Sequence, residues 1–462
     1  MSDAFPSSAS SFAPADQVLI ALAQLNPVAG DPAGNAGRVR AARALAGGQG
    51  AELVAFPELF LSGRPPEERM LAPDFQAACR EEVEALARET ADGGPALLLG
   101  APWSEGGRLF NAALLLEGGK VAASRFKVEL AGSGRWEERR VFTPGPLPGP
   151  LAFRGVRLGV PVGADLASAD VIECLAETGA EILIAPGASP HQRQAQDERL
   201  SLAVARVMES GLPLAWLNPV GGQGALGFDG GSFVLNADRT LAVQLPNFQE
   251  RVRITRWERW ADGWRCEEGA RAPLLEGDEA DYAAAMLGLR DTVEKNGHSG
   301  TVLPLAGDAA ALAGVLAGVL AVDALGAERV QAVAFAAPAP EGSADAAALM
   351  QVLGVRTDTA PMAELLQAVA GVVAPLAAAP QDGRDTLPAH LRAALLQTLA
   401  DRRCALLLAP GEDVPGAFDP LAGLDDTQWI RLSRLRNRWK PAGALGPDGP
   451  VVPDALLAAL PG

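Results

Sequence analysis

The strongest constraint on the fold of this chain is the alternation of short apolar runs with amphipathic segments in its first half. Runs such as "VLIALAQLNPV" (18–28), "AELVAFPE" (51–58) and "EILIAPGAS" (181–189) have β-type composition and end near Pro or Gly. Helix-type segments, including 35–50 and 75–94, lie between such runs. Because paired strands also interrupt the rhythm, we expect a layered α/β domain with helices outside two sheets.

The pattern changes between residues 250 and 282, where the chain becomes charged and rich in Trp without a clean period. After this stretch a simpler βαβ rhythm returns, which favours a parallel sheet covered by helices. The expected organisation is a flexible leader 1–16, a first domain 17–255, a connector 256–281 and a second domain 282–462.

Charge argues against two classes of partner. The 462-residue chain has a formal net charge of −17, which repels nucleic acid and anionic membranes. The basic segment 431–440 is interpreted as a solvated helix face. The most apolar run, 309–322, is shorter than the roughly 20 residues that span a bilayer, so a buried helix is expected. With no signal-type start, a cytoplasmic location is expected.

Metal and disulfide chemistry are not indicated. The four cysteines are far apart and form no CxxC pair, and there are only three histidines. We therefore predict no metal ligands.

Two charged residues stand out as candidates for chemistry. Glu58 follows an apolar strand, at the end where open α/β folds place ligands, and could act as a general base if burial raises its pKa. Lys127, if buried beside a carboxylate, could stabilise an oxyanion. Taken alone, a surface turn residue and a solvated lysine are the simpler interpretations.

Several stretches together resemble a known family. "FPELFLSG" around Glu58, the segment from Lys127 through "WEERRVFTPG", and "LGVPVGADL" (158–166) resemble the nitrilase superfamily. "LSGRPPEE", "GASP" and "GLRDTVEKNG" extend the resemblance to glutamine-dependent NAD+ synthetases over nearly the whole chain. The resemblance implies a nitrilase-like α-β-β-α sandwich followed by a Rossmann-like parallel α/β domain of the adenine nucleotide alpha hydrolase type.

In that family a glutamate activates a cysteine thiol, which attacks the glutamine amide, and ammonia passes to the second domain. The resemblance assigns the base to Glu58, the lysine to Lys127 and a second glutamate to Glu138. The nucleophile position is Gly163, which has no side chain and cannot form a thioester. Arg64 replaces a family tyrosine, and Cys174, on an apolar helix face, is expected to pack in the core.

The second domain departs from the family in its phosphate loop. The family motif SGGxDS cradles pyrophosphate with glycines, hydroxyls and a helix N-terminus. Here it reads "AGDAAA", so Ala306, Gly307, Asp308 and Ala311 are the candidate nucleotide-binding positions of a degenerate loop. ATP and Mg²⁺ are expected only if this site works, and the resemblance leads us to expect that most of the family's C-terminal extension is missing.

Three interpretations remain open at this point. The first is a pseudoenzyme that has lost both activities and binds a ligand, regulates or scaffolds, as a homo-oligomer or with an active NAD+ synthetase homologue. The second is an active glutamine-dependent enzyme that makes NAD+ from deamido-NAD+ and ATP, with displaced motifs. The third is a structural interaction module.

Overall fold

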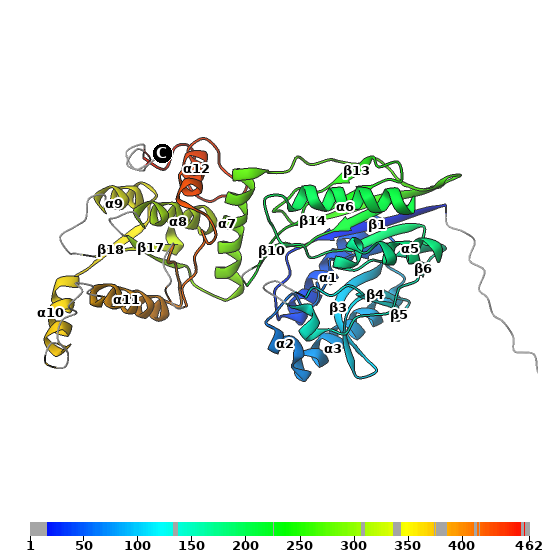
Figure 1. Cartoon of the computed structure of the whole chain (residues 1–462), viewed down its shortest axis with the longest axis horizontal. Coiled ribbons are helices and arrows are strands. Elements are labelled where there is room, and N and C mark those ends of the chain that lie inside the picture. Colours follow the sequence, from blue (N-terminus) through cyan, green and yellow to red (C-terminus); the bar gives the residue numbers. More distant parts are fainter. Residues whose placement is uncertain are drawn as a thin grey trace, which may run out of the picture. The chain divides into compact units, whose positions relative to one another are not determined.

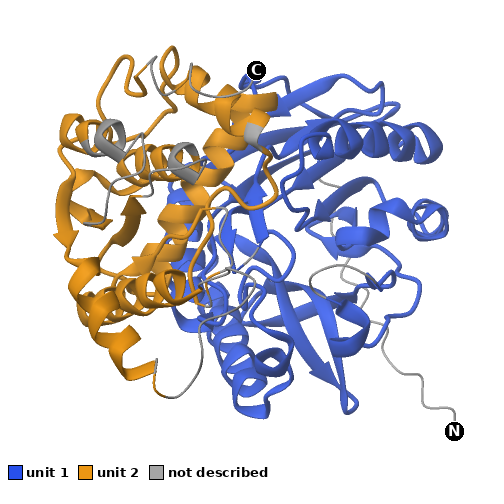
Figure 2. Ribbon diagram, turned by 60° about the vertical axis from the view of Figure 1, so that its left-hand side comes forward, with its two compact units in different colours: residues 1–274 blue, residues 275–462 orange. Residues whose placement is uncertain are grey.

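The computed structural model divides the chain into two compact units, residues 1–274 and 275–462 (Figure 2). The residues that it describes are 16–132, 137–224, 226–305, 310–335, 343–373, 375, 386–410, 414, 416–453 and 457.

The first unit contains a mixed sheet of seven strands in the order β15-β14-β1-β2-β3-β4-β5. β1, β2 and β3 run parallel, and the other neighbours are antiparallel. In chain order these strands are β1 (Gln17–Gln24), β2 (Leu53–Ala55), β3 (Ala96–Glu105), β4 (Arg108–Glu117), β5 (Lys120–Phe126), β14 (Arg251–Trp260) and β15 (Gly263–Cys266).

A second sheet has six strands in the order β13-β12-β9-β8-β7-β6, with β7, β8 and β9 parallel. A two-stranded hairpin, β10-β11, accompanies it. The strands are β6 (Leu151–Phe153), β7 (Val156–Gly159), β8 (Ile182–Pro186), β9 (Leu214–Leu217), β10 (Val220–Gln223), β11 (Leu226–Asp229), β12 (Phe233–Leu235) and β13 (Leu241–Gln244).

Side-chain alternation along the strands builds three apolar layers. Ile20 of β1 and Ile184 of β8 belong to the core between the two sheets. Their neighbours Ala21 and Ala185 face away, into the cores under the outer helices. Because every second residue changes face, these strands are apolar on both sides. The helices of this unit are α1 (Pro32–Gly47), α2 (Glu67–Leu71), α3 (Pro73–Glu89), α4 (Glu138–Val141), α5 (Ala169–Glu177) and α6 (Ala195–Ser210) (Figure 1).

The expected sandwich with helices outside two sheets is therefore confirmed: α1 and α3 share a core with the first sheet, and α5 and α6 with the second. The connector expected from residue 256 is wrong over residues 256–266, because residues 251–258 of β14 pair with the whole of β1 and β15 continues that sheet. Charged residues of β14 are exposed on both faces: Arg251 and Arg253 on the face of Trp257, and Arg256 and Glu258 on the opposite face, whereas Trp257 itself is buried between the sheets. The charges that obscured the pattern therefore belong to a strand whose two faces are each exposed over part of its length.

The second unit has a parallel sheet of four strands in the order β18-β17-β16-β19, with helices on both faces. This matches the expected Rossmann-like arrangement. Its elements are α7 (Gly277–Lys295), β16 (Thr301–Leu305), α8 (Ala310–Leu325), β17 (Val330–Phe335), α9 (Ser343–Val352), β18 (Arg356–Ala360), α10 (Met362–Val373), α11 (Leu387–Arg403), β19 (Leu406–Leu407) and α12 (Asp426–Arg436). Over the described ranges, no helix combines the length and the apolar character that a bilayer crossing requires.

A buried ion pair fixes α12 in the second unit. Arg436 and Asp323 are each 1% exposed in their side chains, with Nε and Oδ2 2.6 Å apart. Tyr282 of α7 donates its hydroxyl to the same carboxylate at 2.6 Å. The interpretation of 431–440 as a wholly solvated face is therefore wrong at Arg436, although Arg434 and Arg438 are exposed.

Candidate functional site

The loop after β2 presents Glu58 at the carboxyl end of the parallel strands. Its backbone N–H donates to the carbonyl of Gly187, which follows β8 of the other sheet, at 3.1 Å. Gly100 of β3 lies directly beneath, where a Cβ atom would come within 2.2 Å of the Pro57 carbonyl oxygen. Only glycine fits there, so the loop packs directly against the backbone of β3. Glu58 itself is buried.

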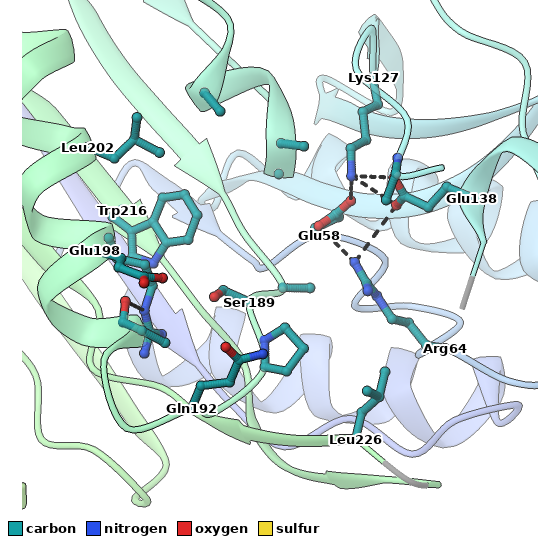
Figure 3. A pocket seen from close by; sticks show the side chains of 18 residues that line it. Glu58, Arg64, Lys127, Glu138, Ser189, Gln192, Glu198, Leu202, Trp216 and Leu226 are labelled. Atoms are coloured by element: carbon teal, nitrogen blue, oxygen red, sulfur yellow. Dashed lines mark hydrogen bonds and ion pairs between the residues drawn. The ribbon is translucent and has the colours of Figure 1, made fainter. Parts of the chain in front are cut away.

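Lys127 and Glu138 reach Glu58 from separate elements. Lys127 follows β5, and its Nζ lies 2.7 Å from Glu58 Oε1 and 2.7 Å from Glu138 Oε2. Glu138 opens the short helix α4 and also accepts the N–H of Ala131 at 3.0 Å. The three candidate residues, distant in sequence, thus form one buried cluster (Figure 3).

Two further residues complete this cluster. Arg64 Nη2 lies 3.1 Å from Glu58 Oε2 and 3.8 Å from Glu138 Oε1. Asn111 of β4 donates its amide to Glu58 Oε1 at 2.7 Å. We call Glu58, Arg64, Asn111, Lys127 and Glu138 the charge cluster; its two cations balance its two carboxylates.

This pairing sets the protonation of Glu58. Burial alone would raise the pKa of Glu58, but the charges of Lys127 and Arg64 outweigh it and lower that pKa to about 2. Burial would likewise lower the pKa of Lys127, and the two carboxylates raise it instead. The condition named for a general base, a Glu58 pKa raised by burial, is therefore not met. A carboxylate held as a stable anion is a weak general base at neutral pH.

The strand-to-helix corner lies against this cluster. β7 ends at Gly159, because Pro161 has no N–H for a ladder, and a 3₁₀ turn spans Gly163–Ala167. Gly163 has φ 55°, and a Cβ atom there would lie 2.5 Å from Glu58 Oε2. The Glu58 carboxylate thus occupies the space that a side chain at position 163 would need.

Asp165 joins this corner to the Lys127 loop. Its carboxylate accepts the N–H groups of Val128, Glu129 and Val162 at 2.9, 2.7 and 3.1 Å. Burial raises the pKa of Asp165 to about 6, against the effect of these donors. Cys174 lies further on, partly buried in α5, and is not one of the residues around the cavity described next.

A cavity with a volume of about 470 Å³ opens over the charge cluster (Figure 3). The charge cluster forms one side of the cavity, and Leu202, Trp216 and Glu198 line the opposite side. A volume of this size accommodates a small organic molecule. The lining residues are Glu58, Arg64, Lys127, Ala131, Glu138, Gly163, Ala164, Ala167, Ala188, Ser189, Pro190, Gln192, Ala195, Glu198, Arg199, Leu202, Trp216 and Leu226.

The candidate nucleotide site lies where β16 ends and α8 begins. Ala306, Gly307 and Asp308 are outside the described residues, and Ala311 is in the first turn of α8. No group of three or more His, Cys, Asp or Glu side chains suited to a metal ion occurs within the part of the chain that the structure describes.

Family models match both units: carbon–nitrogen hydrolase over residues 19–259 and NAD synthase over residues 282–434. A glutamine-dependent NAD(+) synthetase of Rhodobacter capsulatus is 38% identical, over 96% of this chain and 82% of that protein. The solved glutamine-dependent NAD+ synthetase of Acinetobacter baumannii, in complex with ADP, superposes with a TM-score of 0.85 at 26% identity. That match covers 96% of this chain and 85% of the other.

Proposed function

Because this chain belongs to the glutamine-dependent NAD+ synthetase family, we propose that it is a member without glutaminase or ligase activity, whose first unit retains a ligand-binding cavity. One observation carries the proposal: position 163 has no side chain, and the Glu58 carboxylate occupies the side-chain space.

The chemistry of amide hydrolysis supports the loss of glutaminase activity. Covalent catalysis requires a nucleophile that attacks the amide carbon and a base that accepts its proton. Gly163 offers neither a thiol nor a hydroxyl. Glu58, with its pKa lowered to about 2, accepts a proton poorly at neutral pH. Lys127 is engaged by two carboxylates. None of the described residues that line the cavity is a cysteine, so no thiol among them substitutes.

The loss of ligase activity is supported by the sequence of the phosphate loop. Residues 306–311 read AGDAAA, without a hydroxyl and with Asp308 where phosphate must approach. Two like charges about 4 Å apart repel by about 4 kcal/mol at an effective dielectric constant of 20. We therefore expect neither ATP nor Mg²⁺ to serve as a cofactor of this chain.

The retained cavity supports a role in binding. The charge cluster is neutral as a whole and its charges are paired with one another, so the cavity does not depend on a charged ligand for charge balance. We propose a regulatory or scaffolding role in the cytoplasm, as a homo-oligomer or in association with an active NAD+ synthetase homologue. The proposed working domains are residues 17–255 and 282–462, the first extended through β15.

Two assays test this proposal on the purified full chain. Ammonia release from glutamine, and exchange of pyrophosphate into ATP with deamido-NAD+, are measured beside the Rhodobacter capsulatus relative as positive control. We expect signal at the level of a protein-free blank in both. Turnover in both assays would instead identify an active NAD+ synthetase.

Binding and association are tested separately. Calorimetry with glutamine asks whether the cavity takes an amide ligand without hydrolysing it. Size-exclusion chromatography, with and without an active synthetase from the same cell, tests whether the two proteins associate. Independent elution at every ratio contradicts the association.

A further inference from the structure

The empty side-chain position at 163 and the position of Glu58 are linked. An ideal Cβ on Gly163 would lie 2.5 Å from Oε2, 2.8 Å from Cδ and 2.8 Å from Oε1 of Glu58. Contacts under 3.0 Å to a Cβ atom require the neighbour to move. Any residue other than glycine at position 163 therefore requires the Glu58 carboxylate to shift.

The Glu58 carboxylate is held from two sides. Oε1 accepts from Lys127 Nζ at 2.7 Å and from Asn111 Nδ2 at 2.7 Å. Oε2, the oxygen nearest the missing Cβ, accepts from Arg64 Nη2 at 3.1 Å. Charge-assisted bonds of this kind are about twice as strong as neutral ones.

Arg64 is itself fixed in place. Its backbone N–H donates to the side chain of Gln223 at 2.8 Å, and its side chain is only 12% exposed. Arg64 therefore supplies a guanidinium cation directly to the oxygen that faces position 163.

We propose that Arg64 is a positioning residue that locks the Glu58 carboxylate into the side-chain space of residue 163, so that an arginine at 64 and a side chain at 163 exclude each other. This inference rests on the proposed loss of glutaminase activity and gives it a structural cause. Restoring a cysteine at position 163 is then insufficient by itself, because the carboxylate held by Arg64 obstructs it.

A double-mutant cycle tests the lock. Gly163→Ala introduces the Cβ, and Arg64→Met removes the charge while keeping much of the side-chain volume. The left-handed φ strain at 163 occurs in both backgrounds and cancels in the cycle. Without Arg64, Oε2 loses its charged partner while Lys127 and Asn111 still hold Oε1, so the carboxylate can rotate and carry Oε2 away from position 163. Gly163→Ala should raise the unfolding equilibrium constant in both backgrounds. We expect the factor of increase to be about ten times smaller in the Arg64→Met background than in the wild type.

Two matched variants sharpen the result. Gly211 has φ 67° and no atom within 4 Å of its ideal Cβ. Gly211→Ala should therefore lower the free energy of unfolding by the same amount in the wild-type and Arg64→Met backgrounds. Arg64→Lys keeps the charge, and in this background the cost of Gly163→Ala should stay near its wild-type value. The proposal would be overturned if the stability costs of Gly163→Ala and Arg64→Met simply add. It would also be overturned if Arg64→Lys reduces the cost of Gly163→Ala as much as Arg64→Met does.

A variant unchanged at position 163 provides a second readout if Gly163→Ala does not fold. In Arg64→Met, two buried carboxylates share Lys127, so one of them is favoured in its protonated form. A carboxyl pKa raised on folding makes stability fall as pH rises through that pKa. We expect this variant to lose stability between pH 5 and 8 relative to the wild type, and an unchanged profile contradicts the lock. Ammonia release by the wild type would contradict the proposed function without affecting the outcome of the cycle.

Discussion

Replacing Lys127 by methionine tests whether the charge cluster stabilises the first unit. The Nζ atom lies 2.7 Å from a carboxylate oxygen of both Glu58 and Glu138, and all three side chains are at most 3% exposed. Removing one partner of a buried ion pair costs about 3–5 kcal/mol, because the remaining charge is left without compensation. For a unit of this size that corresponds to a fall in melting temperature of about 6–20 °C.

The sign of the pH dependence follows from the same geometry. In the variant, Glu58 and Glu138 share Arg64 alone, so one carboxyl has its pKa raised on folding. Stability is then fullest below the pKa of an unfolded glutamate, about 4.3, and declines as pH rises through the folded pKa. The destabilisation should therefore be larger at pH 8 than at pH 5.

Tryptophan fluorescence during urea unfolding measures this change. Lys120→Met, at an exposed position of β5, is the control for loss of one surface charge and should stay within about 0.5 kcal/mol of wild type. If Lys127→Met costs less than about 1 kcal/mol, or costs more at pH 5 than at pH 8, the cluster is not the stabilising network described.

Three further outcomes are expected. The pKa of Glu58 is lowered to about 2, so the contribution of its ionised carboxylate to stability is present above pH 4.5 and is lost as pH falls toward 2. The difference in free energy of unfolding between wild type and Glu58→Gln, measured by urea unfolding, should therefore narrow below pH 4. Arg436→Met should destabilise the second unit by about 3–5 kcal/mol in calorimetry, and the added change Asp323→Leu should recover part of that loss. Burial raises the pKa of Cys79 to about 12, so Ellman's reagent at pH 8 should label the exposed Cys404 first and Cys79 only after unfolding.

The sequence predicted the layers of the fold because its buried strands are apolar on both faces. Strands such as β1 and β8 are nearly continuous apolar runs, and glycines or prolines mark their ends. β14 was missed because exposed charged residues occur on both of its faces, so it shows no clean alternation and resembles a linker when read without a partner strand. Its assignment depends on pairing with β1, more than 200 residues earlier, which no local pattern reveals.

The site was only partly accessible from the sequence. Family-like motifs pointed to Glu58, Lys127 and Glu138, and the structure brings them together. Asn111 carried a usable signal, as the one amide within the apolar run 109–116. The direction of the Glu58 pKa shift could not be predicted, because it depends on the charges of Lys127 and Arg64, which the fold brings to the carboxylate.

The pairing of β1 with β14 also affects how the chain is made. β1 can join β2 soon after synthesis, but its other edge receives β14 only after a further 227 residues, from Gln24 to Arg251. At typical elongation rates of 5–20 residues per second, that edge stays unpaired for about 10–50 s on the ribosome. An apolar strand edge open for so long is prone to pair with other chains. Nascent chains that stall before residue 260 should therefore depend on chaperones, whatever the stability of the finished protein.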